Sequence, residues 1–191
     1  MKKIVAIVQA SGYSRRMGVD KLLLPLKGKP IYRHVLDCLQ GTELEEIIVV
    51  SRFEEVLRAA KEMGYIPVHN MDAQIGQSRS ITLGLQYAAE ADGYLFIVAD
   101  QPFISKETIS SIIGEFEEMG GIVLPLYGGK RGSPGLFDGS YRKRLMSLTG
   151  EETGKLIIGE SQEDLHFIWI DRKEEGEDVD TMEVYERMMS S

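Results

Sequence analysis

The stretch "IVAIVQASGYSRRMGVDK", residues 4–21, decides the fold. Its first five residues, "IVAIV" (4–8), are apolar and mostly β-branched, which is typical of a strand buried on both faces in a parallel sheet. The rest of the stretch combines two glycines with three cations, Gly12, Gly18, Arg15, Arg16 and Lys21. Glycine lets a backbone turn tightly and approach a ligand, and cationic side chains bind phosphate. The stretch therefore predicts a strand that ends in a polyphosphate-binding loop.

Two familiar phosphate-binding motifs do not fit this loop. A P-loop places its lysine directly after the second glycine, whereas here Gly18 and Lys21 are separated by two residues. The dinucleotide fingerprint needs a glycine between Gly12 and Gly18, and none is present. The loop is therefore expected to hold a polyphosphate by another arrangement. The alternative is a solvated surface loop with scattered basic residues.

The overall charge favours a small anionic ligand over nucleic acid. The chain of 191 residues has a formal net charge of -8, so a basic loop stands out against an acidic background. A protein that binds duplex nucleic acid would instead be expected to carry a broad basic face. With 43% hydrophobic and 27% charged residues, and no repeat or linker, the chain is expected to form one domain over residues 1–191.

The cysteine content and the length of the apolar runs indicate in which cellular compartment the protein is expected. Cys38 is the only cysteine, so neither a disulfide framework nor a thiolate zinc site is expected. The longest apolar run after the first strand is "LFIVA" (95–99), far below the roughly 20 residues that span a bilayer. These features predict a cytoplasmic protein without a membrane partner.

Strand-like and helix-like segments alternate along the chain. Further strands are expected at 47–51, 65–69, 94–99, 122–127 and 167–170. Helices are expected at 30–41, 53–64, 78–93, 105–121, near 139–148, near 153–160 and from about Thr181. Residues 128–137 are expected to form turns that lead into a short strand. This order predicts an α/β fold, a Rossmann-like three-layer αβα sandwich with a mostly parallel central sheet.

Ligands of such sheets bind beyond the carboxyl ends of the strands, so the loops at 9–21, 70–78 and 100–105 are the candidate site. Asp100 follows the strongly apolar run at 94–99, and a carboxylate there suits Mg²⁺, which takes one or two carboxylates together with phosphates. The alternative for Asp100 is a turn or a cap of the next helix. We expect Lys21 and Asp100 to share one cleft.

Two other segments have a functional and a structural interpretation. Gln77 and Ser78 begin a helix, with Ser78 as the expected N-cap, and polar groups at a helix start can hold a base or sugar. Plain capping explains them equally well. Asp178 and Asp180 precede the last helix, where acidic residues usually complement the helix dipole. A second metal ligand is the other interpretation of Asp180.

Taken together, the segments resemble the nucleotidyltransferases of molybdenum cofactor biosynthesis, the MobA-like NTP transferase family. "ASGYSRRMGVDKLLLPLKGKP" (10–30) matches the signature A-A-G-x-S-x-R-M-G-x-x-K-L-L-L-P-x-x-G-x-P. "GQSRSITLGL" (76–85) matches G-Q-S-x-S-I-x-x-G-L, and "ADQPFI" (99–104) matches the metal motif with D-Q-P or D-M-P. "IVLPLYGGKRGSPGLF" (122–137) and "DVDTMEVY" (178–185) match later landmarks. The resemblance covers nearly the whole chain.

The resemblance implies a role for residues on the nucleoside side of the site. Ala10, Ser11 and Gly12 are expected to contact the nucleotide through their backbone. Gln77 and Ser78 are expected to approach the base or the ribose.

It also implies how the triphosphate and the acceptor are held. Arg16 and Lys21 are expected to bind the triphosphate and to stabilise the pyrophosphate leaving group. Asp100 is expected to hold Mg²⁺, with Asp180 as a further metal ligand. Residues 128–135 are expected to border the acceptor pterin.

The implied activity is transfer of CMP from CTP to molybdopterin, with a molybdenum hydroxylase as a protein partner that the resemblance allows. The block G-Q-S-x-S favours the cytidylyl branch. Gln9 and Ser11 replace the usual leucine and alanine beside the expected base pocket, so the choice between CTP and GTP stays open. Met182 and Val184 depart from the family pattern beside Asp180. The alternatives are a guanylyltransferase, a sugar-phosphate nucleotidyltransferase and a non-catalytic accessory protein that binds the cofactor.

Overall fold

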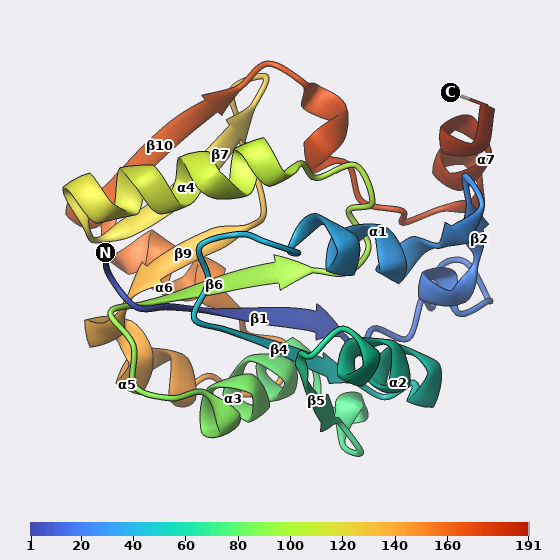
Figure 1. Ribbon diagram of the computed structural model, residues 1–191, viewed down its shortest axis with the longest axis horizontal. Coiled ribbons are helices and arrows are strands. Elements are labelled where there is room, and N and C mark those ends of the chain that lie inside the picture. The colour runs from blue at the N-terminus through green and yellow to red at the C-terminus, as the bar shows by residue number, and fades with distance from the viewer. Residues whose placement is uncertain (191) are drawn as a thin grey trace.

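Strand β1 (Ile4–Ala10) lies inside an eight-stranded sheet of the computed structural model, which describes residues 1–190. It pairs in parallel with β4 (Glu46–Ser51) on one side and with β6 (Gly93–Val98) on the other. β5 (Ile66–His69) extends the sheet in parallel beyond β4. The carboxyl ends of these strands therefore lie at one edge of the sheet, where the arrowheads of β1, β4 and β6 point the same way (Figure 1).

The other half of the sheet contains a reversed strand. β9 (Gly135–Asp138) pairs antiparallel with β6 and with β7 (Ile122–Tyr127), and β10 (Leu165–Ile170) pairs in parallel with β7. The short strand β8 (Lys130–Arg131) also pairs with β7. The strand order is β10-β7-β9-β6-β1-β4-β5, with β8 attached to β7. The short strand expected at the end of residues 128–137 is thus β9, and it is the one that joins the two parallel parts of the sheet.

Helices cover both faces of this sheet, which confirms the predicted three-layer αβα sandwich. Alternate residues of β1 enter opposite clusters, Ala6 and Val8 one cluster and Val5 and Ile7 the other. The first cluster includes residues of α1 (Ile31–Cys38), α2 (Glu54–Glu62), α4 (Lys106–Met119) and α7 (Met182–Ser190). The second includes residues of α3 (Gln77–Tyr87), α5 (Arg142–Met146) and α6 (Gly154–Glu160).

Shorter elements connect these layers. β2 (Pro25–Leu26) and β3 (Lys29–Pro30) form a small antiparallel hairpin that the sequence patterns did not predict. Single 3₁₀ turns lie at Lys21–Leu23, Ala73–Ile75, Gly139–Tyr141, Gln162–Asp164 and Lys173–Gly176. No helix within residues 1–190 combines the length and the apolar composition that a membrane span needs.

Helix α3 is shorter than the predicted helix over 78–93, because it ends at Tyr87. The side chain of Arg142 takes up carbonyl groups at this end, donating from Nη2 to Leu85 O at 2.7 Å and from Nη1 to Ala89 O at 3.2 Å. The last carbonyls of a helix have no partner within the helix, so a cation from elsewhere in the chain stabilises this end. The helix pattern of the sequence could not show that contact.

Helix α3 also approaches β1 closely, at Gly84. A Cβ atom placed on Gly84 would lie 2.4 Å from Cγ2 of Ile7, which is 0% exposed. The absence of a side chain at Gly84 therefore sets the distance between α3 and the strand that leads into the loop 11–21.

We predict that Gly84→Ala lowers the free energy of unfolding by about 1–3 kcal/mol, because the added methyl group overpacks the core against Ile7. Urea denaturation measures the change. Gly114→Ala is the matched control, since Gly114 also lies within a helix but has no atom within 4 Å of the added Cβ. At Gly114 we expect a gain of up to about 1 kcal/mol from helix propensity. A Gly84→Ala protein as stable as the Gly114→Ala protein would contradict this packing.

Candidate active site

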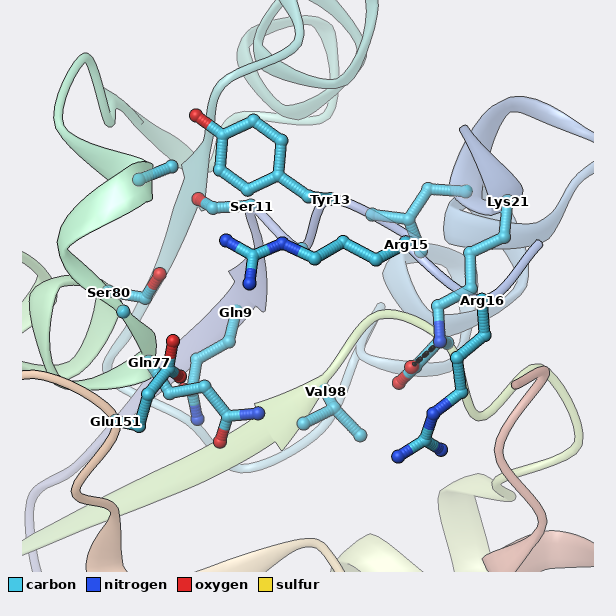
Figure 2. A pocket seen from close by; sticks show the side chains of 15 residues that line it. Gln9, Ser11, Tyr13, Arg15, Arg16, Lys21, Gln77, Ser80, Val98 and Glu151 are labelled. Carbon is cyan, nitrogen blue, oxygen red and sulfur yellow. Dashed lines mark ion pairs between the residues drawn. The ribbon is translucent and has the colours of Figure 1, made fainter. Parts of the chain in front are cut away.

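A cavity of about 420 Å³ lies at the edge of the sheet where β1 and β6 end (Figure 2). Its volume is in the range of small-molecule binding sites, roughly 300–1,000 Å³. The cavity is lined by Gln9, Ser11, Gly12, Tyr13, Arg15, Arg16, Lys21, Leu22, Ala73, Gly76, Gln77, Ser80, Val98, Asp100 and Glu151. These residues come from the end of β1 and the loop after it, the start of α3, the end of β6 and the turn before α6.

The loop after β1 is held in a fixed conformation by its own backbone. Ser14 has a φ of 50° and Gly18 a φ of 67°, so both adopt the left-handed conformation. The N–H groups of Met17 and Gly18 donate to Ser14 O at 2.9 and 3.2 Å. The hydroxyl of Ser14 accepts from the N–H of Lys21 at 3.2 Å. The loop therefore closes on itself and fixes where Lys21 begins.

The start of the loop is tied to β4 by two serine hydroxyls. Ser51 Oγ donates to Ala10 O at 2.8 Å, and Ser11 Oγ donates to Val50 O at 3.1 Å. Among the residues expected to contact the nucleotide here, Ser11 and Gly12 line the cavity. Ala10 is 1% exposed and lies outside the lining.

Lys21 and Asp100 meet inside the cavity. Lys21 Nζ lies 2.5 Å from Asp100 Oδ2 and 2.9 Å from Asp180 Oδ1 (the Lys21–Asp100 pair is the dashed line of Figure 2). Burial by itself would lower the pKa of Lys21, but the two carboxylates outweigh it and raise the pKa above its usual value. Lys21 is therefore a charged ammonium, 8% exposed, in contact with two carboxylates.

Asp180 reaches the site although it lies far along the chain. The N–H of the preceding residue, Val179, donates to Asp100 O at 2.9 Å and so fastens this segment to the end of β6. Asp180 Oδ2 also lies 3.4 Å from Nη1 of Arg16, whose side chain is 77% exposed. Arg16 and Lys21 thus share Asp180, and both line the cavity, whereas Asp180 contacts the lining from outside.

At the start of α3 the structure differs from the expected capping. The residue before the helix is Gly76, with a φ of 129°, so the prediction that Ser78 is the N-cap is wrong. Ser78 is 2% exposed and its hydroxyl donates to Gly150 O at 2.8 Å, outside the cavity lining. Gln77 lines the cavity as expected. The close approach of Gly150 to the helix start is what turns Ser78 away from the cavity.

Ser80, Tyr13 and Glu151 line the cavity but were not singled out in the sequence. Ser80 could have been found, because it lies three residues after Gln77 and so on the same helix face. Tyr13 lies inside the loop signature at a variable position. Glu151 carries no sequence signal, because only the packing of the turn before α6 against α3 brings it to the site.

The ring of Tyr13, which lines the cavity, packs against the guanidinium of Arg52. The guanidinium of Arg52 lies 4.5 Å from the ring centroid of Tyr13 and 4.0 Å from that of Phe53. Arg52 also forms an ion pair with Asp20, a residue of the same loop. Arg52 is thus engaged in holding Tyr13 and the loop in place at the mouth of the cavity.

The residues around Asp100 suit a divalent cation. In this structure the ammonium of Lys21 lies between Asp100 and Asp180 and pairs with both carboxylates. Mg²⁺ is commonly held by one or two carboxylates, with phosphate oxygens and waters as its remaining ligands. No group of three or more His, Cys, Asp and Glu side chains that could hold a metal occurs within residues 1–190. The donor set fits a cation that binds together with a triphosphate.

The family model named "MobA-like NTP transferase domain" matches residues 6–165 of the chain. The chain belongs to the MobA-like NTP transferase family. The resemblance inferred from the sequence motifs is confirmed. The match includes Lys21, Asp100 and Glu151, whereas Asp180 lies beyond it.

Two relatives cover nearly the whole of this MobA-like chain. "Purine catabolism protein PucB" of Bacillus subtilis (strain 168) is 28% identical over 206 residues, with 96% of this chain and 94% of that protein covered. A "Probable molybdenum cofactor guanylyltransferase" of Bacillus cereus (strain AH820) is 27% identical over 183 residues, with 94% and 87% covered.

Solved structures share the fold of this MobA-like protein. "A nucleotidyl transferase from Methanothermobacter thermautotroptrophicus" superposes with a TM-score of 0.84 at 24% identity, over 98% of this chain and 96% of that chain. The complex of Rv0371C with manganese from Mycobacterium tuberculosis H37Rv superposes with a TM-score of 0.80 at 23% identity, over 99% of both chains. At these identities the likeness establishes the fold alone.

The carboxyl of Asp178 gives the site a pH-dependent contribution to stability. Partial burial of the carboxyl group, followed by the negative charge of Asp100, raises the pKa of Asp178 to about 6. Unfolded aspartate titrates near 3.9. Because the folded state binds this proton more strongly, the contribution is present below about pH 4 and is lost as the pH rises through about 6.

We predict that Asp178→Asn raises the free energy of unfolding at pH 8 and leaves it unchanged at pH 4. Although its carboxyl group is partly buried, the residue as a whole is exposed, so water screens the charge of Asp178. The gain in the free energy of unfolding at pH 8 is therefore expected to stay below about 1 kcal/mol. Urea denaturation at both pH values measures it. Asp171→Asn, at an exposed aspartate outside the cavity, is the control. Equal effects of Asp178→Asn at the two pH values would contradict the assigned cause.

Proposed function

We propose that the protein transfers CMP from CTP to a molybdopterin-type acceptor and releases pyrophosphate. Membership of the MobA-like family makes the chain a nucleotidyltransferase. The observation that supports the proposed site is the contact between Lys21 and Asp100 in one cavity, beside the glycine loop. The choice of CTP is supported by the segment "GQSRS" (76–80), which resembles the cytidylyl branch of the family.

In the proposed reaction, a phosphate oxygen of the acceptor attacks the α-phosphorus of the nucleoside triphosphate. A new phosphorus–oxygen bond forms, and the bond between the α-phosphorus and the bridging oxygen breaks. Pyrophosphate departs with the electron pair of that bond. The acceptor phosphate is already ionised, so this step needs no strong general base. Catalysis then rests on positioning and on stabilisation of negative charge.

Arg16 and Lys21 are the groups proposed to stabilise that charge. The exposed guanidinium of Arg16 can bind phosphate oxygens in pairs, and Lys21 supplies a point charge inside the cavity. A triphosphate brings oxygens that compete with Asp100 and Asp180 for the ammonium of Lys21. Lys21 is therefore proposed to turn from the carboxylates towards the substrate.

Asp100 and Asp180 are the residues proposed to hold Mg²⁺. Their oxygens already contact one cation at 2.5 and 2.9 Å in the free protein. When bound, Mg²⁺ would neutralise charge on the phosphates as a Lewis acid. The manganese complex of Rv0371C, which has the same fold, supports the binding of a divalent ion by this fold.

A second candidate is transfer of GMP, which the name of the guanylyltransferase relative favours. A pyrophosphate-release assay with all four triphosphates, each alone, with molybdopterin and with sugar phosphates, separates the candidates. We expect release with CTP and molybdopterin together. Release with GTP would assign the guanylyl activity, and release only with a sugar phosphate would assign another acceptor. Binding of nucleotide without any release would make the protein a non-catalytic accessory protein.

We predict that Lys21→Ala and Asp100→Ala each lower kcat about 10²–10³-fold, the size found when one charge-stabilising group is removed. Steady-state pyrophosphate release measures kcat, and thermal melting shows whether each variant folds. Lys143→Ala, which removes an exposed lysine of α5 outside the cavity, is the control and should keep full activity. A folded Lys21→Ala protein with unchanged kcat would refute the role of Lys21.

We predict that activity is lost with a chelator and that Asp180→Asn raises the Mg²⁺ concentration for half-maximal activity about 10–100-fold, as for other disturbed metal sites. Titration of Mg²⁺ at saturating triphosphate measures the shift. Asp171→Asn is the control. An unchanged Mg²⁺ dependence in Asp180→Asn would restrict Asp180 to pairing with Lys21 and Arg16.

A further inference from the structure

Three polar side chains converge at the end of the cavity opposite the Lys21–Asp100 pair. Gln9 comes from β1, Gln77 from the start of α3 and Glu151 from the turn before α6, and Figure 2 shows their side chains gathered on one side of the cavity. Within residues 1–190, no other side chain or backbone group hydrogen-bonds or pairs with these three side chains. Two amides and a carboxylate are thus available to a ligand at this end.

The turn that carries Glu151 is fastened on both sides. Gly150 O accepts hydrogen bonds from Ser78 N at 3.2 Å and from Ser78 Oγ at 2.8 Å. Glu152 Oε2 accepts from Thr149 N at 2.7 Å and from Thr149 Oγ1 at 3.0 Å. The neighbours of Glu151 are therefore bound within the protein, and Glu151 alone is directed to the cavity.

The turn can approach α3 this closely only because Gly76 has no side chain. A Cβ atom on Gly76 would lie 2.3 Å from Gly150 O, and the φ of 129° at Gly76 also disfavours other residues. The placement of a carboxylate at this end of the cavity is thus built into the packing of two distant segments.

We propose that Glu151, with Gln9 and Gln77 beside it, recognises the 2-amino-4-oxopyrimidine edge of a substrate. An ionised carboxylate only accepts hydrogen bonds, so its match is a pair of adjacent donors. A ring N–H next to an exocyclic NH₂ group gives such a pair, in the two-point geometry that carboxylates prefer. The amides of Gln9 and Gln77 can donate to the 4-oxo group of the same ring.

The acceptor of the proposed reaction and the GTP of the second candidate reaction could each supply this edge, and the inference rests on the proposed function. The pterin of a molybdopterin-type acceptor and the guanine of GTP share the 2-amino-4-oxopyrimidine ring. Cytosine instead presents its amino group beside a ring nitrogen that carries no hydrogen. If the donor is CTP, as proposed, Glu151 therefore belongs to the acceptor side of the cavity.

The test compares ligand pairs that differ at the 2-amino group. Pterin is compared with lumazine by their fluorescence, and GTP with ITP by calorimetry, on the full chain. We expect the unmodified protein to prefer the amino-bearing member of one pair about 10–100-fold, the size of a hydrogen bond to a charged group. Glu151→Gln should abolish that preference at unchanged thermal stability. Glu163→Gln, at an exposed glutamate outside the cavity, should keep it.

If Glu151→Gln loses the preference for pterin, Glu151 contacts the acceptor. If it loses the preference for GTP, Glu151 contacts the nucleobase. Equal affinities within both pairs in the unmodified protein, or an unchanged preference in Glu151→Gln, would overturn the inference. Pyrophosphate release is followed in parallel. Release without any amino preference overturns only the role of Glu151, and a preference without release overturns only the proposed transfer.

Discussion

The ammonium of Lys21, held between the carboxylates of Asp100 and Asp180, is the interaction on which the rest of the site depends. A largely buried charge is costly unless it is paired. Here the pairing joins the turn after the glycine loop, the end of β6 and the segment before α7. The ammonium of Lys21, which pairs with these carboxylates in the free protein, is also a group that a triphosphate could bind. The carboxylates themselves are groups that a divalent cation could bind.

The sheet makes this contact possible, because parallel strands deliver their loops to one edge. β1 lies between β4 and β6, so the loop that follows β1 and the aspartate that follows β6 are neighbours at that edge. The hydroxyls of Ser11, at the start of the loop, and of Ser51, at the end of β4, fix the position of the loop relative to β4. The contact of Gly84 with Ile7 sets how near α3 comes to the same strand.

The cavity has two chemically different ends. One end carries fixed charge, with Lys21 and Asp100, and suits phosphates and a cation. The other end carries the uncharged amides of Gln9 and Gln77 together with Glu151, and suits the hydrogen-bonding edge of a heterocycle. A substrate with a phosphate joined to a ring system would have groups that match both ends.

The fold followed from the sequence because strand and helix periodicity is local, and the alternation of "IVAIV" with helical patterns requires a covered parallel sheet. Lys21 and Asp100 were also predictable, because Lys21 ends the glycine loop after β1 and Asp100 lies just past the end of β6. Gly76, Ser78 and Glu151 were not, since their roles arise where the turn at Gly150 packs on α3. The sequence by itself determined the charged end of the cavity. Only the tertiary structure decided that Glu151 joins Gln9 and Gln77 at the other end, because contacts between segments more than 70 residues apart leave no periodic signal.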